Sequence, residues 1–230
     1  MVDSTLHFDS HWTEQVTLAD GREITLRLVR PEDKDLFVEG LARLSDESRY
    51  RRFFTHKTSL STGELRYLTE LDGERHFALG ALERDPAGAT RGVGVARFVR
   101  LQDPHVAEPA VAVVDACQGK GLGKHLLLRL CAAATERGVH TFRAEVLPDN
   151  EPILALLRSL SSDVETRWKD DLLVVDMTLP EVALDHQPHE APHGHVLYRL
   201  LSHVGSGATD VARTLDRLRL QLIRGRHAGS

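Results

Sequence analysis

The segment Ala116–Leu127, ACQGKGLGKHLL, joins an apolar run that ends at Val114 to a stretch with leucines at every fourth position from Leu122. Three glycines at alternate positions and two lysines lie where the two patterns meet. The apolar run predicts a strand, the glycines a tight turn, and the leucine spacing a helix. This order is typical of a phosphate site, because the first N–H groups of a helix lack internal partners and carry partial positive charge.

Three glycine-rich motifs compete for this segment. The nucleotide P-loop requires a glycine at 118 and a hydroxyl at 125, where the chain has Gln118 and His125. The dinucleotide fingerprint fits Gly119 and Gly121, but its third glycine comes one residue early, at Gly123. The pattern Q/R-x-x-G-x-G/A is satisfied in full by Gln118, Gly121 and Gly123.

With this pattern, the segments AEPAVAVVDACQGKGLGKHLL, AEVLPDN, LRLVRPED and LSDESRYRRFF resemble the GNAT superfamily of N-acetyltransferases, and among them the GNAT domains of bacterial Pat-type protein-lysine acetyltransferases. The resemblance covers about residues 16–180. It implies an α/β fold with a mixed, partly splayed sheet of about six or seven strands and helices on both faces. Two features depart from the family pattern: Ser161-Ser162 replaces a common Gly-Phe, and Leu157 stands where a tyrosine is often found.

The resemblance also implies the cosubstrate, acetyl-CoA, and the residues that hold it. The pantetheine arm is expected to pair with the backbone of Val111 and Val113, and Asn150 matches the asparagine that contacts this arm. Asn150 also suits the N-cap of the helix that follows. The pyrophosphate is expected on the glycine-rich turn, which comprises Gln118, Gly119, Lys120, Gly121, Leu122, Gly123 and Lys124.

Acetyl transfer to an amine needs a general base, because keeping a lysine amine neutral at pH 7 costs about 4–5 kcal/mol. Glu108 is the candidate catalytic residue: it begins the strand that leads into the turn, and the resemblance places the family's proposed base there. Strand alternation puts Glu108 on one face with Ala110 and Ala112. Glu145 and His105 are the rival bases.

The domain organisation follows from composition and turn signals. We expect an N-terminal arm at 1–15, the acetyltransferase domain at 16–180, and a His/Pro-containing linker with a C-terminal helical extension at 181–230. Within the domain, Asp20-Gly21 predicts a hairpin turn, and Gly138 is expected to end the helix that starts at Leu122.

The bulk properties restrict compartment and partners. The chain of 230 residues has a formal net charge of −5 and a pI of about 6.2, which argues against a nucleic-acid binder. Two cysteines, the lack of a signal pattern at the start, and the lack of an apolar run of about 18 residues favour a cytoplasmic protein without membrane contact. No metal is expected, because the linker histidines match no ligand spacing; they are His186, His189, His193 and His195.

Together these observations predict an acetyl-CoA-dependent N-acetyltransferase acting on a primary amine, as a monomer or homodimer. The resemblance favours a protein lysine as acceptor. A small-molecule amine acetyltransferase and a non-catalytic acyl-CoA-binding sensor remain the alternatives, and turnover with a candidate acceptor separates them.

Overall fold

The computed structural model describes residues 6–46, 58–85, 87–146, 148, 151–170 and 172–180, with the side chains of 151–153 excepted. The predicted linker with its four histidines (His186, His189, His193 and His195), the C-terminal extension and Asn150 lie outside the described residues. The N-terminal segment contributes to the domain, because Phe8 is buried in the main core and the first strand begins at Thr13.

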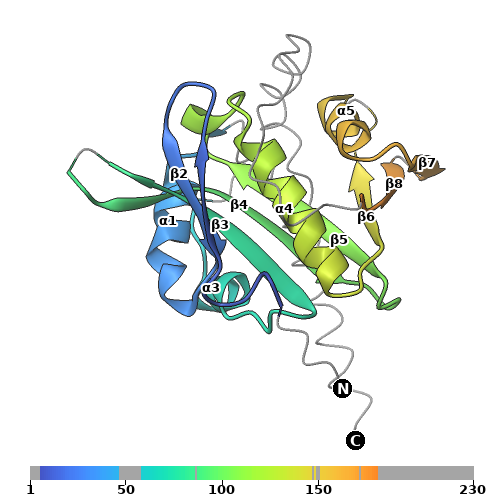
Figure 1. Ribbon diagram of the computed structural model, residues 1–230, viewed down its shortest axis with the longest axis horizontal. Helices are drawn as coiled ribbons and strands as arrows, with labels where there is room; N and C mark the ends of the chain where they lie inside the picture. Colours follow the sequence, from blue (N-terminus) through green and yellow to red (C-terminus); the bar gives the residue numbers. More distant parts are fainter. Residues whose placement is uncertain are drawn as a thin grey trace, which may run out of the picture.

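Eight strands form one sheet in the order β1-β2-β3-β4-β5-β6-β8-β7 (Figure 1). The strands are β1 (Thr13–Thr17), β2 (Glu23–Leu28), β3 (His76–Arg84), β4 (Thr90–Arg100), β5 (Val106–Val113), β6 (Thr141–Val146), β7 (Val164–Lys169) and β8 (Leu172–Thr178). The helices are α1 (Lys34–Ala42), α3 (Thr62–Thr69), α4 (Leu122–Glu136) and α5 (Glu151–Leu160), with short 3-10 turns η1 (Pro31–Asp33) and η2 (Asp115–Cys117).

The α/β architecture predicted from the sequence is confirmed. The sheet is mixed: β5 and β6 run parallel, and all other neighbours are antiparallel. It has eight strands rather than six or seven, because the hairpin β1–β2 joins its edge through a turn at Gly21, whose φ is +82°. None of the helices in the described ranges is both long and apolar enough to cross a bilayer.

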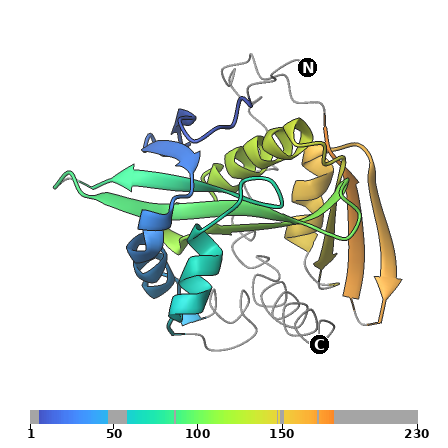
Figure 2. The same ribbon diagram turned by 90° about the horizontal axis from the view of Figure 1, so that it is seen from below.

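Helices cover both faces of the sheet. In Figure 2, α1 and α3 lie on one side of the central strands and α4 lies on the other. The main core fills the α4 side, where Leu122, Leu126 and Leu130 are almost fully buried. A smaller apolar cluster on the α1 side contains Leu41, Leu44 and Leu60.

An irregularity in β4 makes Gly92 and Gly94, two residues apart, face opposite sides of the sheet. Ala81 is opposite Gly94, but Leu82 is opposite Gly92, so β4 carries one extra residue at this point. A side chain added at Gly92 would meet Leu36 of α1, whereas one added at Gly94 would meet Leu126 of α4. Both helices therefore approach the backbone of β4 closely.

We expect Gly94→Ala to destabilise the fold. The added Cβ would lie 3.1 Å from Leu126 Cδ1 and 3.2 Å from the Ala112 carbonyl oxygen, and overpacking of this kind costs about 1–3 kcal/mol. Gly63→Ala is the matched control, since its Cβ meets nothing within 4 Å on α3. Urea titrations should show a lower midpoint for Gly94→Ala alone, and equal midpoints would contradict the close approach of α4.

Candidate active site

The strands β5 and β6 separate in the middle of the sheet. Their parallel pairing covers only Val106 with Thr141 and Ala107 with Phe142. Beyond Ala107, β5 continues to Val113 along β4, while β6 turns away toward β8 (Figure 1). The expected splay is therefore present, and it opens one edge of β5.

Pro109 accounts for the place where the pairing stops. The N–H of Val114 donates to Val93 of β4, and backbone groups alternate between the two edges of a strand. The nitrogen of Pro109 and the N–H groups of Val111 and Val113 therefore face the β6 side. Because proline has no N–H, the parallel ladder cannot continue at Pro109, while the β4–β5 ladder on the other edge is unaffected.

The glycine-rich turn presents a row of backbone donors at the end of this open edge. Gly119 and Gly121 have φ of 70° and 92°, a left-handed conformation that favours glycine. Across the described ranges, no acceptor receives the N–H groups of residues 119–123, which lead directly into α4. Successive N–H groups at a helix N-terminus form an anion-binding surface.

Gln118 supports the turn from within. Its side-chain amide donates to the Val113 carbonyl at 3.0 Å and to an Asp115 carboxylate oxygen at 3.3 Å. The same carboxylate accepts the backbone N–H of Ser45 at 2.8 Å. The glutamine therefore holds the end of β5 to the turn.

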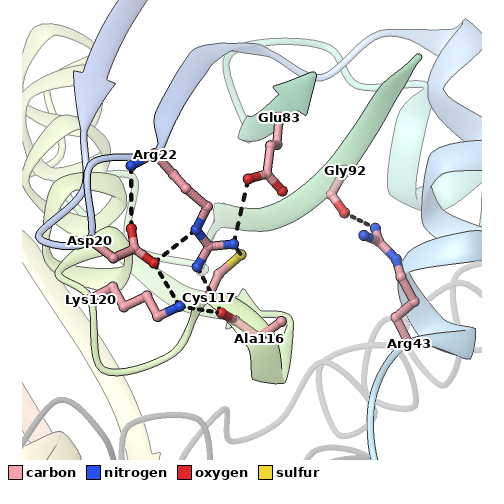
Figure 3. A network of polar contacts seen from close by, with 8 residues as sticks. All are labelled: Asp20, Arg22, Arg43, Glu83, Gly92, Ala116, Cys117 and Lys120. Carbon is pink, nitrogen blue, oxygen red and sulfur yellow. Dashed lines mark hydrogen bonds and ion pairs between the residues drawn. The ribbon is translucent and has the colours of Figure 1, made fainter. Parts of the chain in front are cut away.

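The two lysines of the turn differ in their surroundings. The Lys120 ammonium lies 2.7 Å from Asp20 in the β1–β2 turn and donates to the Ala116 carbonyl at 2.9 Å (Figure 3). The hydrogen bond from Lys120 to the Asp20 carboxylate lowers the pKa of Asp20 to about 2, so Asp20 is ionised at neutral pH. Lys124 makes no ion pair within the part of the chain that the structure describes, which leaves its charge available beside the N–H row.

Arg22 ties the β1–β2 turn to the same loop. Its guanidinium donates to the Ala116 carbonyl at 2.7 Å and contacts the Cys117 sulfur at 3.1 Å, and it pairs with Asp20 and with Glu83 of β3 (Figure 3). The Cys117 thiol is buried, and burial raises its pKa. Cys117 is therefore a packing residue of the loop.

Glu108 lies near the start of β5 on the face that α1 and α3 cover. It is opposite Val99 of β4, and Arg97 is opposite Ala110 on the same face. Arg97 is buried; it donates to the Leu68 carbonyl of α3, contacts His76 Nε2 at 3.2 Å and lies over the Phe37 ring. Burial lowers its pKa to about 10, which leaves the guanidinium charged at neutral pH.

Tyr67 of α3 is affected by the charges of both Arg97 and Glu108. Burial raises the pKa of its hydroxyl to about 12, while the charge of Arg97 lowers that pKa and the charge of Glu108 raises it. The hydroxyl is buried, and no hydrogen-bond partner is found for it among the described residues. Its ring packs against that of His76 in a tilted arrangement, with 4.6 Å between the centroids. Arg97 and Glu108 thus both act electrostatically on the Tyr67 hydroxyl near the point where β5 and β6 separate.

The rival bases have other partners. Glu145 of β6 pairs with Lys169 of β7 at 3.2 Å. His105 is exposed, with Nδ1 2.9 Å from the Gly138 carbonyl oxygen and its ring stacked on His140. Neither lies on the strand that leads to the glycine-rich turn.

Comparison with known proteins assigns the family. The model of the acetyltransferase (GNAT) family matches residues 41–161, about half of the chain. An acetyltransferase of Pseudomonas aeruginosa is 32% identical over 128 residues, which is 56% of this chain and 67% of that protein. The chain belongs to the GNAT acetyltransferase family. The cosubstrate of this family is acetyl-CoA.

Further relatives carry the name Pat. The acetyltransferase Pat of Mycolicibacterium smegmatis is 32% identical over 184 residues, 76% of this chain, and the chain covers 51% of that protein. The chain thus spans about half the length of this relative. The crystal structure of the GNAT domain of S. lividans PAT is 28% identical with a TM-score of 0.65, and covers 75% of this chain and 99% of that chain.

The GNAT motifs identified β5, the glycine-rich turn and Glu108, but other residues of the site were missed. Pro109 could have been found from the sequence, because a proline inside a predicted strand indicates that one edge of the strand is unpaired at that position. Tyr67, His76 and Arg97 come from three elements and share no motif. The described residues contain no group of three potential metal ligands.

We expect His76 to make the stability of this GNAT domain sensitive to acid. Burial, with the nearby charge of Arg97, lowers its pKa to about 3, against about 6.5 in an unfolded chain. The unfolded state therefore binds more protons between these pH values, and the free energy of unfolding falls as the pH drops below about 6.5, by up to about 1.4 kcal/mol per pH unit. Chemical denaturation between pH 7 and pH 4 should show a shallower fall for His76→Gln, and parallel profiles would contradict the assignment.

Proposed function

We propose that this GNAT acetyltransferase transfers the acetyl group of acetyl-CoA to the ε-amine of a protein lysine, with Glu108 as general base. One observation carries the proposal: a single strand, β5, links a carboxylate at its start to an open backbone edge and then to a row of free N–H donors. These are the groups that a thioester with a long polar arm and a pyrophosphate requires, in the required order.

The glycine-rich turn would hold the pyrophosphate. Backbone N–H groups of residues 119–123 would donate to its oxygens, and Lys124 would add charge. Lys120 would remain shared with Asp20, so part of its charge is already neutralised. The open edge of Val111 and Val113 would pair with the pantetheine amides as an additional strand does. Asn150, outside the described residues, stays a candidate contact of the arm.

Glu108 would accept the proton of the attacking amine, directly or through a water. An ammonium must lose this proton before its nitrogen can attack, and a positioned base contributes about 10²–10⁴ to the rate. The Tyr67 hydroxyl, for which no hydrogen-bond partner is found among the described residues, would donate to Glu108.

The edge of β5 would also polarise the thioester. A backbone N–H at Val111 or Val113 can donate to the carbonyl oxygen as negative charge develops there. The departing thiol needs no acid, since a pKa near 8.5 makes it a fair leaving group. Leu157, buried in the core, supplies no proton at the position of the family's frequent tyrosine.

The acceptor is tested with acetyl-CoA and a cell lysate. Acetyl-lysine that appears in mass spectra with the purified chain, but not with Glu108→Gln, supports a protein acceptor. Release of CoA only with small amines would show that the acceptor is a small-molecule amine and not a protein lysine. Binding of acetyl-CoA without release of CoA by any acceptor would indicate a sensor.

Gly121→Ala should weaken acetyl-CoA binding at least tenfold, because a Cβ at a φ of 92° strains the turn and enters the space before the N–H row. Gly138→Ala is the matched control: its φ is 76° at the other end of α4, so it imposes similar strain far from the turn. Calorimetry should show wild-type affinity for Gly138→Ala. Equal losses in both variants would mean that the turn is only structural.

Glu108→Gln should lower kcat about 10²–10⁴-fold near neutral pH while the affinity for acetyl-CoA stays the same. The defect should shrink at high pH, where more of the amine is already neutral. Glu145→Gln is the matched control and should keep wild-type kcat. A loss in Glu108→Gln that is independent of pH would refute the role of general base.

A further inference from the structure

A cavity lies under α1, beside the proposed path of the cosubstrate. Its volume is about 80 Å³, and it separates α1 from the surface of β3, β4 and β5. Ala112 and Val113 of β5, the strand proposed to hold the pantetheine arm, line the cavity, as does Val114 directly after the strand. Leu68 of α3 lines it as well and links it to Arg97 through its carbonyl. The cavity therefore borders the cosubstrate strand, and one of its lining residues, Leu68, contacts Arg97.

The described residues that line the cavity are mostly apolar. Among them one is charged, Asp33, and it is paired: Arg27 donates to both carboxylate oxygens at 2.6 and 2.8 Å, and the Arg30 N–H donates at 2.8 Å. The other described lining residues contribute aliphatic or aromatic side chains and glycine backbone. Such a space suits a hydrocarbon group better than a polar acceptor.

The cavity exists because glycines occupy positions that face it. Gly40 lies on the stripe of α1 that faces the cavity, with Phe37 and Leu41, and a Cβ at Gly40 would meet nothing within 4 Å. A Cβ at Gly80 of β3 would meet only ordinary contacts, the nearest with Val29 at 3.6 Å. Protein interiors seldom leave such spaces, because an unfilled cavity destabilises the fold.

We propose that this cavity binds the acyl chain of the cosubstrate and that the enzyme prefers CoA thioesters of three or four carbons, propionyl and butyryl, to acetyl-CoA. This inference rests on the proposed cosubstrate site. An apolar cavity of about 150 Å³ holds the six carbons of benzene, so about 80 Å³ holds about three carbons. The space accommodates an acyl tail one or two methylenes longer than acetyl.

The chemistry is the same transfer with a longer acyl group. The amine nitrogen forms a bond to the acyl carbon as the carbon–sulfur bond breaks. The sulfur keeps the electron pair and leaves as CoA thiolate, and the amine proton passes through Glu108 to the solvent or to the thiolate. No further reactant is required.

The test is calorimetric binding of free CoA, acetyl-CoA, propionyl-CoA, butyryl-CoA and hexanoyl-CoA to the full chain. Affinity should rise about fourfold with each methylene from acetyl to butyryl and stop rising at hexanoyl, when the cavity is full. If the affinity falls steadily from acetyl-CoA to butyryl-CoA, the cavity does not bind the acyl chain, whereas the proposed cosubstrate site would still stand. Lack of binding by free CoA would overturn the cosubstrate site, and the cavity proposal with it.

Gly40→Leu fills the cavity from α1 and should lower the ratio of butyryl-CoA to acetyl-CoA affinity at least tenfold. Gly63→Leu adds the same side chain to exposed helical surface on α3 and should leave the ratio and turnover unchanged. If Gly40→Leu fails to fold by circular dichroism, Gly80→Ala adds a single methyl group and should lower the ratio about fourfold. An unchanged ratio in the folded variant would overturn the proposal.

Discussion

The missing N–H of Pro109 is the constraint on which the rest of the site depends. Parallel strands pair through regularly spaced N–H donors, and a proline at a position that faces the neighbouring strand removes one of them. The pairing of β5 with β6 ends at Ala107, two residues earlier. From there, β5 has one edge committed to β4 and one edge free. A free edge inside a sheet is normally a liability, but here it is bordered by a helix N-terminus and a carboxylate, and it is the edge proposed to bind the cosubstrate.

Charge is arranged at the two ends of this edge. At one end, backbone donors and Lys124 supply positive potential, and the Asp20–Arg22 pair of the β1–β2 turn holds the loop in shape. At the other end, the Glu108 carboxylate and the buried Arg97 guanidinium both act electrostatically on the Tyr67 hydroxyl. The reaction proposed for the site needs opposite properties at these ends: attraction for phosphates at the loop, and removal of a proton at the start of the strand.

The sequence predicted those parts of the fold that depend on local pattern. Glycines at alternate positions after an apolar run identified the turn, and the leucine spacing identified α4, because both reflect backbone geometry over a few residues. The sequence could not show that Pro109 ends the pairing of β5 with β6. That effect depends on which edge of β5 the proline nitrogen faces, and the register between β4 and β5 determines the edge. The pairing of Lys120 with Asp20 joins residues 100 positions apart. The cavity under α1 results from side chains that are absent on separate elements, and a sequence pattern does not record where such gaps meet.

The most direct test of this account is amide hydrogen exchange along β5, resolved by residue with nuclear magnetic resonance, with and without acetyl-CoA. In the free protein, the N–H groups of Val111 and Val113 should exchange much faster than those of Ala110 and Ala112, which face β4. Acetyl-CoA should slow Val111, Val113 and residues 119–123, and leave Ala110 and Ala112 unchanged. Uniform protection along β5 in the free protein, or no effect of acetyl-CoA on Val111 and Val113, would contradict the account.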